Sequence, residues 1–80
     1  MGISNAVRKR IIELCKKKGI TVNKLSYLSG VPKTTTSNFM NGTNKSIGID
    51  NLKKLIDGLD ISITDFFDTE VFRNLEQEIK

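Results

Sequence analysis

The sequence contains no histidine, no tryptophan, one cysteine and one proline in 80 residues. With Cys15 alone and no histidine, neither an intramolecular disulfide nor a zinc site of the Cys/His type can form. No apolar run approaches the roughly 20 residues of a membrane-spanning helix. The first residues show neither a signal peptide nor a myristoylation motif. We therefore predict a cytoplasmic protein without cofactor, metal or membrane contact, in which Cys15 is a small buried apolar residue.

The chain also lacks the residue sets on which common catalytic sites depend. It contains no P-loop, no metal-ligand cluster and no paired acids beside an identifiable pocket. Acidic and hydroxyl residues are present, but no neighbouring group would activate them. A chain of 80 residues without repeats or low-complexity tracts has room for one modest core. We therefore predict a single domain that is not an enzyme.

Positive charge is concentrated in the first half of the chain. Residues 1–45 contain nine Lys and Arg residues and one acid, Glu13, for a net charge of +8. Residues 46–80 contain four bases and eight acids, for a net charge of −4. A basic half of this kind is typical of a protein that binds a polyanion. Solubility alone is the alternative explanation.

The stretch 25–39 has the pattern of two short helices joined by a tight turn. Leu25 and Leu28 give the first helix an apolar stripe. Gly30 can adopt the positive φ that the turn needs, and Pro32 suits the first turn of a second helix. These features together predict a helix-turn-helix.

The second helix of this motif divides into an apolar and a polar face. At 3.6 residues per turn, Thr36, Phe39 and Met40 point inward. The opposite face consists almost entirely of hydrogen-bonding residues, namely Lys33, Thr34, Ser37, Asn38 and Asn41. Four consecutive hydroxyl residues, 34–37, are poor helix formers, so packing must hold this helix. An ordinary solvated face remains the alternative, although such faces usually have Glu–Lys pairs.

Hydrophobic periodicity predicts further helices around the motif. The expected helices cover about residues 5–18, 22–29, 32–41, 48–57, 62–67 and 70–79. Their expected caps are Ser4 or Asn5, Thr21, Ser62 and Thr69, with Gly19 and Gly58 as stops. The expected inward residues are Val7, Ile11, Leu14, Cys15, Ile49, Leu52, Leu55, Ile56, Leu59, Ile61, Phe66 and Phe67. Tyr27 is placed at the edge of the core, and Phe72, Leu75 and Ile79 form the stripe of the last helix.

Read in this order, the residues resemble the helix-turn-helix of the Cro and phage-repressor family, the lambda-repressor-like or xenobiotic-response-element type of bacterial regulators. The similarity runs without a gap from about residue 11 to residue 67. It rests on Leu25, Gly30, Val31, Phe39 and the pair Asn41-Gly42. The resemblance implies an all-α fold: a compact five-helix DNA-binding domain over residues 1–68 with an additional C-terminal helix in residues 69–80. We expect that last helix to pack on its own domain or on a dimer partner.

Three positions depart from the family pattern. Ser26 replaces the usual small alanine, and Thr36 replaces the usual isoleucine or valine. We expect both to loosen the core slightly. Val22 stands where many relatives have a glutamine that grips the DNA backbone, so the phosphate contact at the start of that helix lacks its usual side chain.

By resemblance, Lys33, Thr34 and Asn38 occupy the positions that relatives use to reach base edges, and Ser37 lies beside them. The chemistry agrees, because lysine can donate to guanine, asparagine can bond to adenine and threonine offers a methyl group to thymine. The residues assigned to the DNA backbone are Thr21, Asn41, Thr43 and Lys45. Thr21 can also cap its helix. A plain connection between helices remains the alternative for the loop that contains Thr43 and Lys45.

Other basic residues are expected to act less directly. Arg8, Lys9 and Arg10 are interpreted as sources of long-range attraction to DNA, and residues 16–18 as partners of the helix dipole. The resulting hypothesis is a sequence-specific regulator of transcription that binds double-stranded DNA. We expect a repressor, because the chain has no evident room for activation machinery.

Two copies on a palindromic or pseudo-palindromic operator are expected, because one small domain reads too short a site. The alternative function is a protein-interaction module, such as an antitoxin-like partner that binds another protein through its acidic C-terminal half. Some relatives combine both tasks.

Overall fold

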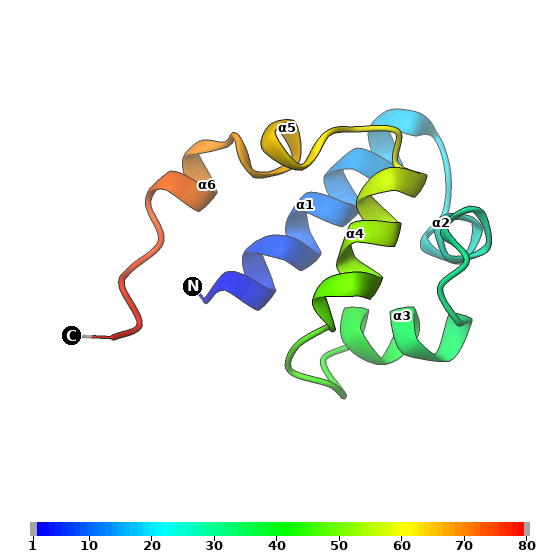
Figure 1. Ribbon diagram of the computed structural model, residues 1–80, viewed down its shortest axis with the longest axis horizontal. Helices are drawn as coiled ribbons and strands as arrows, with labels where there is room; N and C mark the ends of the chain where they lie inside the picture. The colour runs from blue at the N-terminus through cyan, green and yellow to red at the C-terminus, as the bar shows by residue number, and fades with distance from the viewer. Residues whose placement is uncertain (1, 80) are drawn as a thin grey trace.

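The computed structural model describes residues 2–79, which fold into six α-helices (Figure 1). These are α1 (Ile3–Lys18), α2 (Val22–Ser29), α3 (Lys33–Met40), α4 (Ile49–Gly58), α5 (Ile63–Phe67) and α6 (Glu70–Arg73). Within residues 2–79 there is no strand, and none of the helices could span a bilayer. The predicted all-α fold is confirmed.

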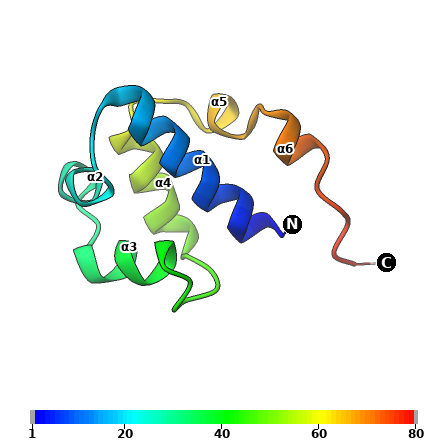
Figure 2. The ribbon, with the colours of Figure 1, turned by 180° about the vertical axis from the view of Figure 1, so that it is seen from behind.

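The core is shared by the first five helices, and α2 lies at its centre in contact with α1, α3 and α4. Its buried apolar residues are Val7, Ile11, Leu14, Cys15, Leu25, Val31, Phe39, Leu55, Ile56, Leu59 and Phe66. Figures 1 and 2 show α1 and α4 crossing the middle of the molecule, with α3 along one edge and α5 along the opposite edge. Burial raises the pKa of the Cys15 thiol, as expected for a small apolar core residue.

Three of the predicted helix N-caps are confirmed, and the fourth is wrong. The hydroxyl oxygens of Thr21 and Ser62 each accept a backbone N–H three residues later, at 3.0 Å. Thr69 caps α6 in the same way. The expected cap of α1 at Ser4 or Asn5 is wrong, because α1 already begins at residue 3, after Gly2. The Gly2 carbonyl accepts the first helical bond at 3.1 Å, so both polar residues lie within the first turn.

Two apolar residues that were expected inward, Ile49 and Leu28, are exposed instead, and so is Tyr27, which was expected at the edge of the core. Ile49 is 82% exposed, because it is the first residue of α4 and precedes the turn that covers the core. Leu28 is 51% exposed and Tyr27 is 79% exposed. The short helix α2 buries only Leu25 and Ser26. At about 100° per residue, Tyr27 and Leu28 lie roughly 150° and roughly 110° around the helix from the midpoint between those two residues, so both face away from the core.

The expected C-terminal helix over residues 70–79 ends at Arg73. Phe72 explains the part that forms, because its ring packs against Phe67 at 4.8 Å between centroids and α6 lies against α1. Beyond it, Leu75 is only partly buried and Ile79 is 82% exposed. A helix this short is not stable without tertiary packing, so it stops where the apolar contacts stop.

α4 ends at Gly58 as expected, but Gly58 is the last residue of the helix rather than a stop beyond it, and Leu59 is the C-cap. A Cβ atom at Gly58 would lie 2.0 Å from Ser29 Oγ and 3.1 Å from Leu25 Cδ1. The missing side chain therefore allows α4 to approach α2 closely. Gly30, in contrast, has the expected role, because its φ of 69° forms the left-handed turn between α2 and α3.

We predict that Gly58→Ala lowers the free energy of unfolding by about 1 kcal/mol or more, although alanine favours helix. The cause is the overlap between the new methyl group and the side chain of Ser29. Chemical denaturation of Gly58→Ala, Ser29→Ala and the double variant measures this effect. The double variant should recover part of the loss, and strict additivity of the two changes would contradict the explanation.

Thr36→Val should stabilise the domain by about 1 kcal/mol. Thr36 is 1% exposed, and its hydroxyl oxygen has no hydrogen-bond partner among the described residues. Valine keeps the shape and removes the buried polar group. The midpoint of urea unfolding should therefore rise; an unchanged or lower midpoint would show that the hydroxyl is satisfied in solution.

Candidate nucleic-acid interface

The polar side of α3 faces away from the core. Lys33, Thr34 and Ser37 are exposed and Asn38 is half-buried. We call these four residues the reading face; they lie on one side of the helix because their spacing is i, i+1, i+4 and i+5. Figures 1 and 2 show α3 along an edge of the molecule, where no other helix covers its outer side. The structure therefore brings all four predicted base-reading residues together on one accessible surface.

Packing on the inner side of α3 offsets its poor helix propensity. Phe39 and Thr36 are each 1% exposed, so this helix is fixed to the core at two positions one turn apart. Pro32 caps the helix start with an extended ψ of 136°, and its carbonyl accepts the N–H of Thr36 at 3.2 Å. The reading face therefore does not have to contribute to folding.

The loop after α3 places three of the predicted backbone-contact residues at the surface. Asn41, Thr43 and Lys45 are all exposed. Asn41 also shapes the loop, because its Oδ1 accepts the N–H of Thr43 at 2.8 Å. The N–H of Asn44 donates to the carbonyl of Asn38 at 2.9 Å, which ties the loop to the end of α3. Sequence reasoning gave Asn41 only a DNA contact and missed this local role.

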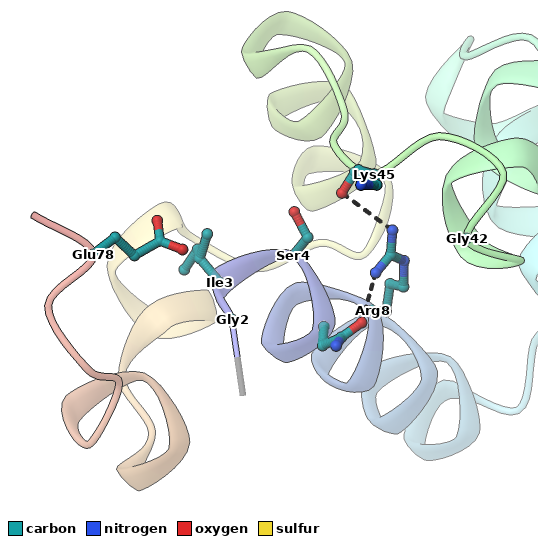
Figure 3. A pocket seen from close by; sticks show the side chains of 8 residues that line it. Gly2, Ile3, Ser4, Arg8, Gly42, Lys45 and Glu78 are labelled. Carbon is teal, nitrogen blue, oxygen red and sulfur yellow. Dashed lines mark hydrogen bonds between the residues drawn. The ribbon is translucent and has the colours of Figure 1, made fainter.

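Arg8 holds the same loop from the other side, which sequence reasoning missed. Its Nε donates to the carbonyl of Phe39 at 2.6 Å, and its Nη2 donates to the carbonyls of Asn44 and Lys45 at 3.0 and 3.2 Å. The guanidinium also lies 4.6 Å from the centre of the Phe39 ring. Figure 3 shows Arg8 between α1 and the chain at Lys45. Arg8 is thus a structural residue rather than only a source of long-range attraction.

Arg10 makes an equivalent connection at another place in the fold. Its Nε and Nη2 donate to the carbonyls of Phe66 and Asp65 at 2.8 and 2.9 Å. Its Nη1 pairs with Glu13. Both arginines therefore bind carbonyl groups at the end of a helix, where cations are favourable. Lys9 is exposed, so its long-range role stays a prediction.

Thr21 lies at the exposed start of α2, where its oxygen caps the helix by accepting the N–H of Lys24 at 3.0 Å. The capping role is confirmed, and the phosphate contact stays a prediction. Val22, at the family's glutamine position, is partly buried and packs against the core. The start of α2 therefore offers backbone N–H groups and Thr21 rather than a long polar side chain.

A hollow of about 300 Å³ lies beside the loop, between the start of α1 and Lys45 (Figure 3). Its lining includes Gly2, Ser4, Arg8, Lys45 and, at the far side in Figure 3, Glu78. Four of the five N–H donors of Arg8 have partners, because Nε and Nη2 donate to carbonyl groups and Nη1 donates to the Asn5 side chain. Lys45 is the exposed cation beside this hollow.

The site therefore has three parts: a left-handed turn at Gly30, a helix with a buried inner side and a polar outer side, and a short exposed loop after it. The model of the Cro/C1-type HTH DNA-binding domain matches residues 10–71. The chain belongs to the Cro/C1-type HTH family. This Cro/C1-type domain is accordingly a DNA-binding regulator of transcription, and the resemblance found in the sequence is confirmed.

Relatives of the Cro/C1-type domain include two regulators from Bacillus subtilis (strain 168). The SPbeta prophage-derived uncharacterized HTH-type transcriptional regulator YopS is 33% identical over 64 residues, which cover 80% of this chain and 86% of YopS. The HTH-type transcriptional regulator SlrR is 37% identical over 62 residues, which cover 76% of this chain and 41% of SlrR. Among solved structures, the prophage Lp1 protein 11 matches with a TM-score of 0.80 and 26% identity, over 92% of this chain and 97% of that one.

Arg8→Met should weaken DNA binding more than Arg10→Met. Each change removes one positive charge and several bonds to helix-end carbonyls, so each should cost about 1–3 kcal/mol of stability. Only Arg8 bonds to the loop that contains Lys45. Fluorescence anisotropy with one labelled duplex, at a temperature where both variants are folded by circular dichroism, compares them. Equal losses of affinity would mean that Arg8 acts through its charge alone.

Proposed function

We propose that this protein is a sequence-specific transcriptional repressor that inserts α3 into the major groove of double-stranded DNA. The observation that supports this best is the reading face itself. Its four side chains offer hydrogen-bond donors, acceptors and a methyl group, and no acid lies among them. An α-helix fits the width of the major groove, where each base pair presents a distinct pattern of such groups.

Each reading-face residue has a base partner that suits its chemistry. Lys33 can donate to O6 and N7 of guanine, and Asn38 can bond to N6 and N7 of adenine. Thr34 and Ser37 can donate or accept, and the methyl group of Thr34 suits thymine. Asn38 is the half-buried member, so its side chain has less freedom to lose on binding than that of Lys33.

The backbone contacts in this proposal come from Thr21, Asn41, Thr43 and Lys45. All four are exposed, and they lie at the start of α2 and in the loop after α3. Such groups bind phosphates and fix the register of the protein without reading sequence. In this proposal residues 1–68 form the DNA-binding unit, and residues 69–80 are a C-terminal segment that packs on its own domain or on a dimer partner.

Two copies on one operator complete the proposal. A single reading face covers only a few base pairs, whereas a two-fold dimer places two recognition helices about 34–36 Å apart on the same side of the duplex. A bound pair of this kind would block the access of other proteins to the DNA that it covers. We therefore infer that the regulator acts as a repressor, and that it does so in the cytoplasm.

A second candidate function is binding of a protein partner through the acidic C-terminal half. Val71 and Ile79 are 46% and 82% exposed, close in sequence to Glu70 and Glu78. Exposed apolar residues among acids suit a basic protein partner. Deleting the residues after Arg73 should abolish such binding and leave DNA selection unchanged, as a pull-down and a mobility shift would show.

Asn38→Ala should lower discrimination at one base pair by about 1–3 kcal/mol, whereas Lys45→Ala should weaken binding to all sequences about equally. The reason is that Asn38 is assigned to a base and Lys45 to a phosphate. Selection from random oligonucleotides first defines the operator, and mobility shifts at two salt concentrations then compare the variants. Lys45→Ala should also reduce the dependence of log affinity on log salt by about one unit.

The matched control is Lys17→Ala, which removes an equal charge from an exposed site at the far end of α1. Its affinity should fall less than that of Lys45→Ala. If Asn38→Ala leaves base preference unchanged, the assignment of the reading face is wrong. A wild-type protein with no preference for any DNA fragment would refute the proposed function itself.

A further inference from the structure

The loop after α3 begins with Asn41-Gly42, a pair with a particular chemical reactivity. Of the seven asparagines in the sequence, only Asn41 is followed by glycine. Asparagine is a thermally labile residue, because the backbone nitrogen of the next residue can attack its side-chain carbonyl carbon. A side chain on that next residue hinders the attack, and glycine has none. Asn41 and Gly42 are both exposed, so water can reach the reacting groups.

The surroundings of the Asn41 side chain favour attack on its carbonyl carbon. Its Oδ1 accepts the N–H of Thr43 at 2.8 Å. A donor at this position stabilises the negative charge that develops on Oδ1 when a nucleophile adds to Cγ. The space around Gly42 is also open, because a Cβ atom built there would meet nothing within 4 Å beyond the adjacent residues. The carbonyl carbon is therefore activated and accessible.

Hydrogen bonds to the end of α3 hold the attacking nitrogen away. Asn41 has a ψ of 0°, which turns the nitrogen of Gly42 toward the backbone nitrogen of Asn41 rather than toward its side chain. The N–H of Gly42 donates to the carbonyl of Phe39 at 3.2 Å. Arg8 donates to the same carbonyl at 2.6 Å and to two carbonyls farther along the loop (Figure 3). The attack therefore requires a local opening of the loop, and Arg8 opposes that opening.

We propose that Asn41 is a site of spontaneous deamidation, which converts the loop after α3 from a form that binds DNA to one that repels it. The nitrogen of Gly42 gives up its proton and forms a bond to Cγ of Asn41. The Cγ–Nδ2 bond breaks, and Nδ2 leaves as ammonia with that proton. Water then opens the cyclic imide: addition at Cγ gives aspartate, and addition at the backbone carbonyl carbon of residue 41 gives isoaspartate. No other reactant is needed.

Both products place a carboxylate in a segment that has none. Residues 32–48 contain Lys33 and Lys45 and no Asp or Glu. The new carboxylate is negative at neutral pH and repels the phosphates that Lys45 attracts. Isoaspartate also adds one carbon to the backbone between α3 and Lys45. This effect on DNA binding rests on the proposed function, whereas the chemistry of Asn41 does not depend on it.

DNA binding should in turn slow the reaction. Under the proposed function, Asn41 and Lys45 lie against phosphates when the protein is bound. A ligand that binds only the closed loop lowers the population of the open loop. Bound copies should therefore keep the Asn41 amide, and free copies should lose it with age. The modification would act on the unbound copies of the regulator.

The first experiment incubates the full chain at neutral pH, with and without a duplex that carries the selected operator, and follows deamidation by mass spectrometry. Trypsin releases residues 34–45 as one peptide. Asn44 in this peptide is the internal control, because it is exposed in the same loop but precedes a lysine. We expect Asn41 to be converted well before Asn44, and more slowly with the duplex. Arg8→Met should accelerate the conversion at least roughly tenfold, since it removes hydrogen bonds from a charged group, and Arg10→Met should not.

The second experiment measures the effect on DNA binding by anisotropy with one labelled duplex. We expect the deamidated fraction of the wild type, and Asn41→Asp, to bind at least roughly fivefold more weakly, which is the effect of a negative charge about 4 Å from a phosphate in water. Aged Asn41→Gln should bind like fresh Asn41→Gln, because the longer side chain cyclises more slowly. Asn74→Asp adds the same charge at an exposed site at the end of α6 and should match the wild type.

The inference fails if the Asn41 amide is lost no faster than that of Asn44, or if the deamidated fraction binds the duplex as tightly as fresh protein. Equal rates in Arg8→Met and Arg10→Met would contradict the control by loop opening. A rate that the duplex does not change would contradict protection by DNA. Wild-type protein that prefers no duplex would refute the proposed function, and mass spectrometry would still decide whether Asn41 is the reactive site.

Discussion

The bonds from Arg8 to the end of α3 are the contact on which the geometry of the site depends. The guanidinium of Arg8, on α1, donates to the carbonyl of Phe39 near the end of α3. It also donates to the carbonyls of Asn44 and Lys45 in the loop that follows. It also covers the ring of Phe39, the largest buried side chain of α3. Through this one residue, the angle of the helix and the path of the following loop are fixed together.

The weak helix propensity of α3 makes that support necessary. The hydroxyl residues 34–37 would not hold a helix in isolation, since their side chains compete for the backbone. The helix is stabilised instead by its surroundings: the burial of Thr36 and Phe39, the turn at Gly30 and the hydrogen bonds from Arg8. The close approach of α4 to α2 at Gly58 extends the same rigid frame across the core.

The sequence was sufficient for features that depend on local chemistry. Caps at Thr21 and Ser62, the left-handed Gly30 and the inner side of α3 follow from spacing within a few residues, and all are confirmed. The roles of Arg8 and Gly58 were missed because their partners are distant in sequence; Phe39 lies 31 residues after Arg8. Hydrophobic periodicity also predicted that Ile49 is buried and that the last helix continues beyond Arg73, and both predictions were wrong. Periodicity cannot show where neighbouring elements stop covering a helix.

The inner side of α3 packs on the core and its outer side does not, which affects the substitutions that each side can tolerate. Inner side chains and Arg8 maintain the scaffold, while the four outward residues make few demands on it. Substitutions at those four sites can therefore accumulate at little thermodynamic penalty. Under the proposed function, in which these four residues contact bases, such substitutions would change the preferred DNA target without any redesign of the interior.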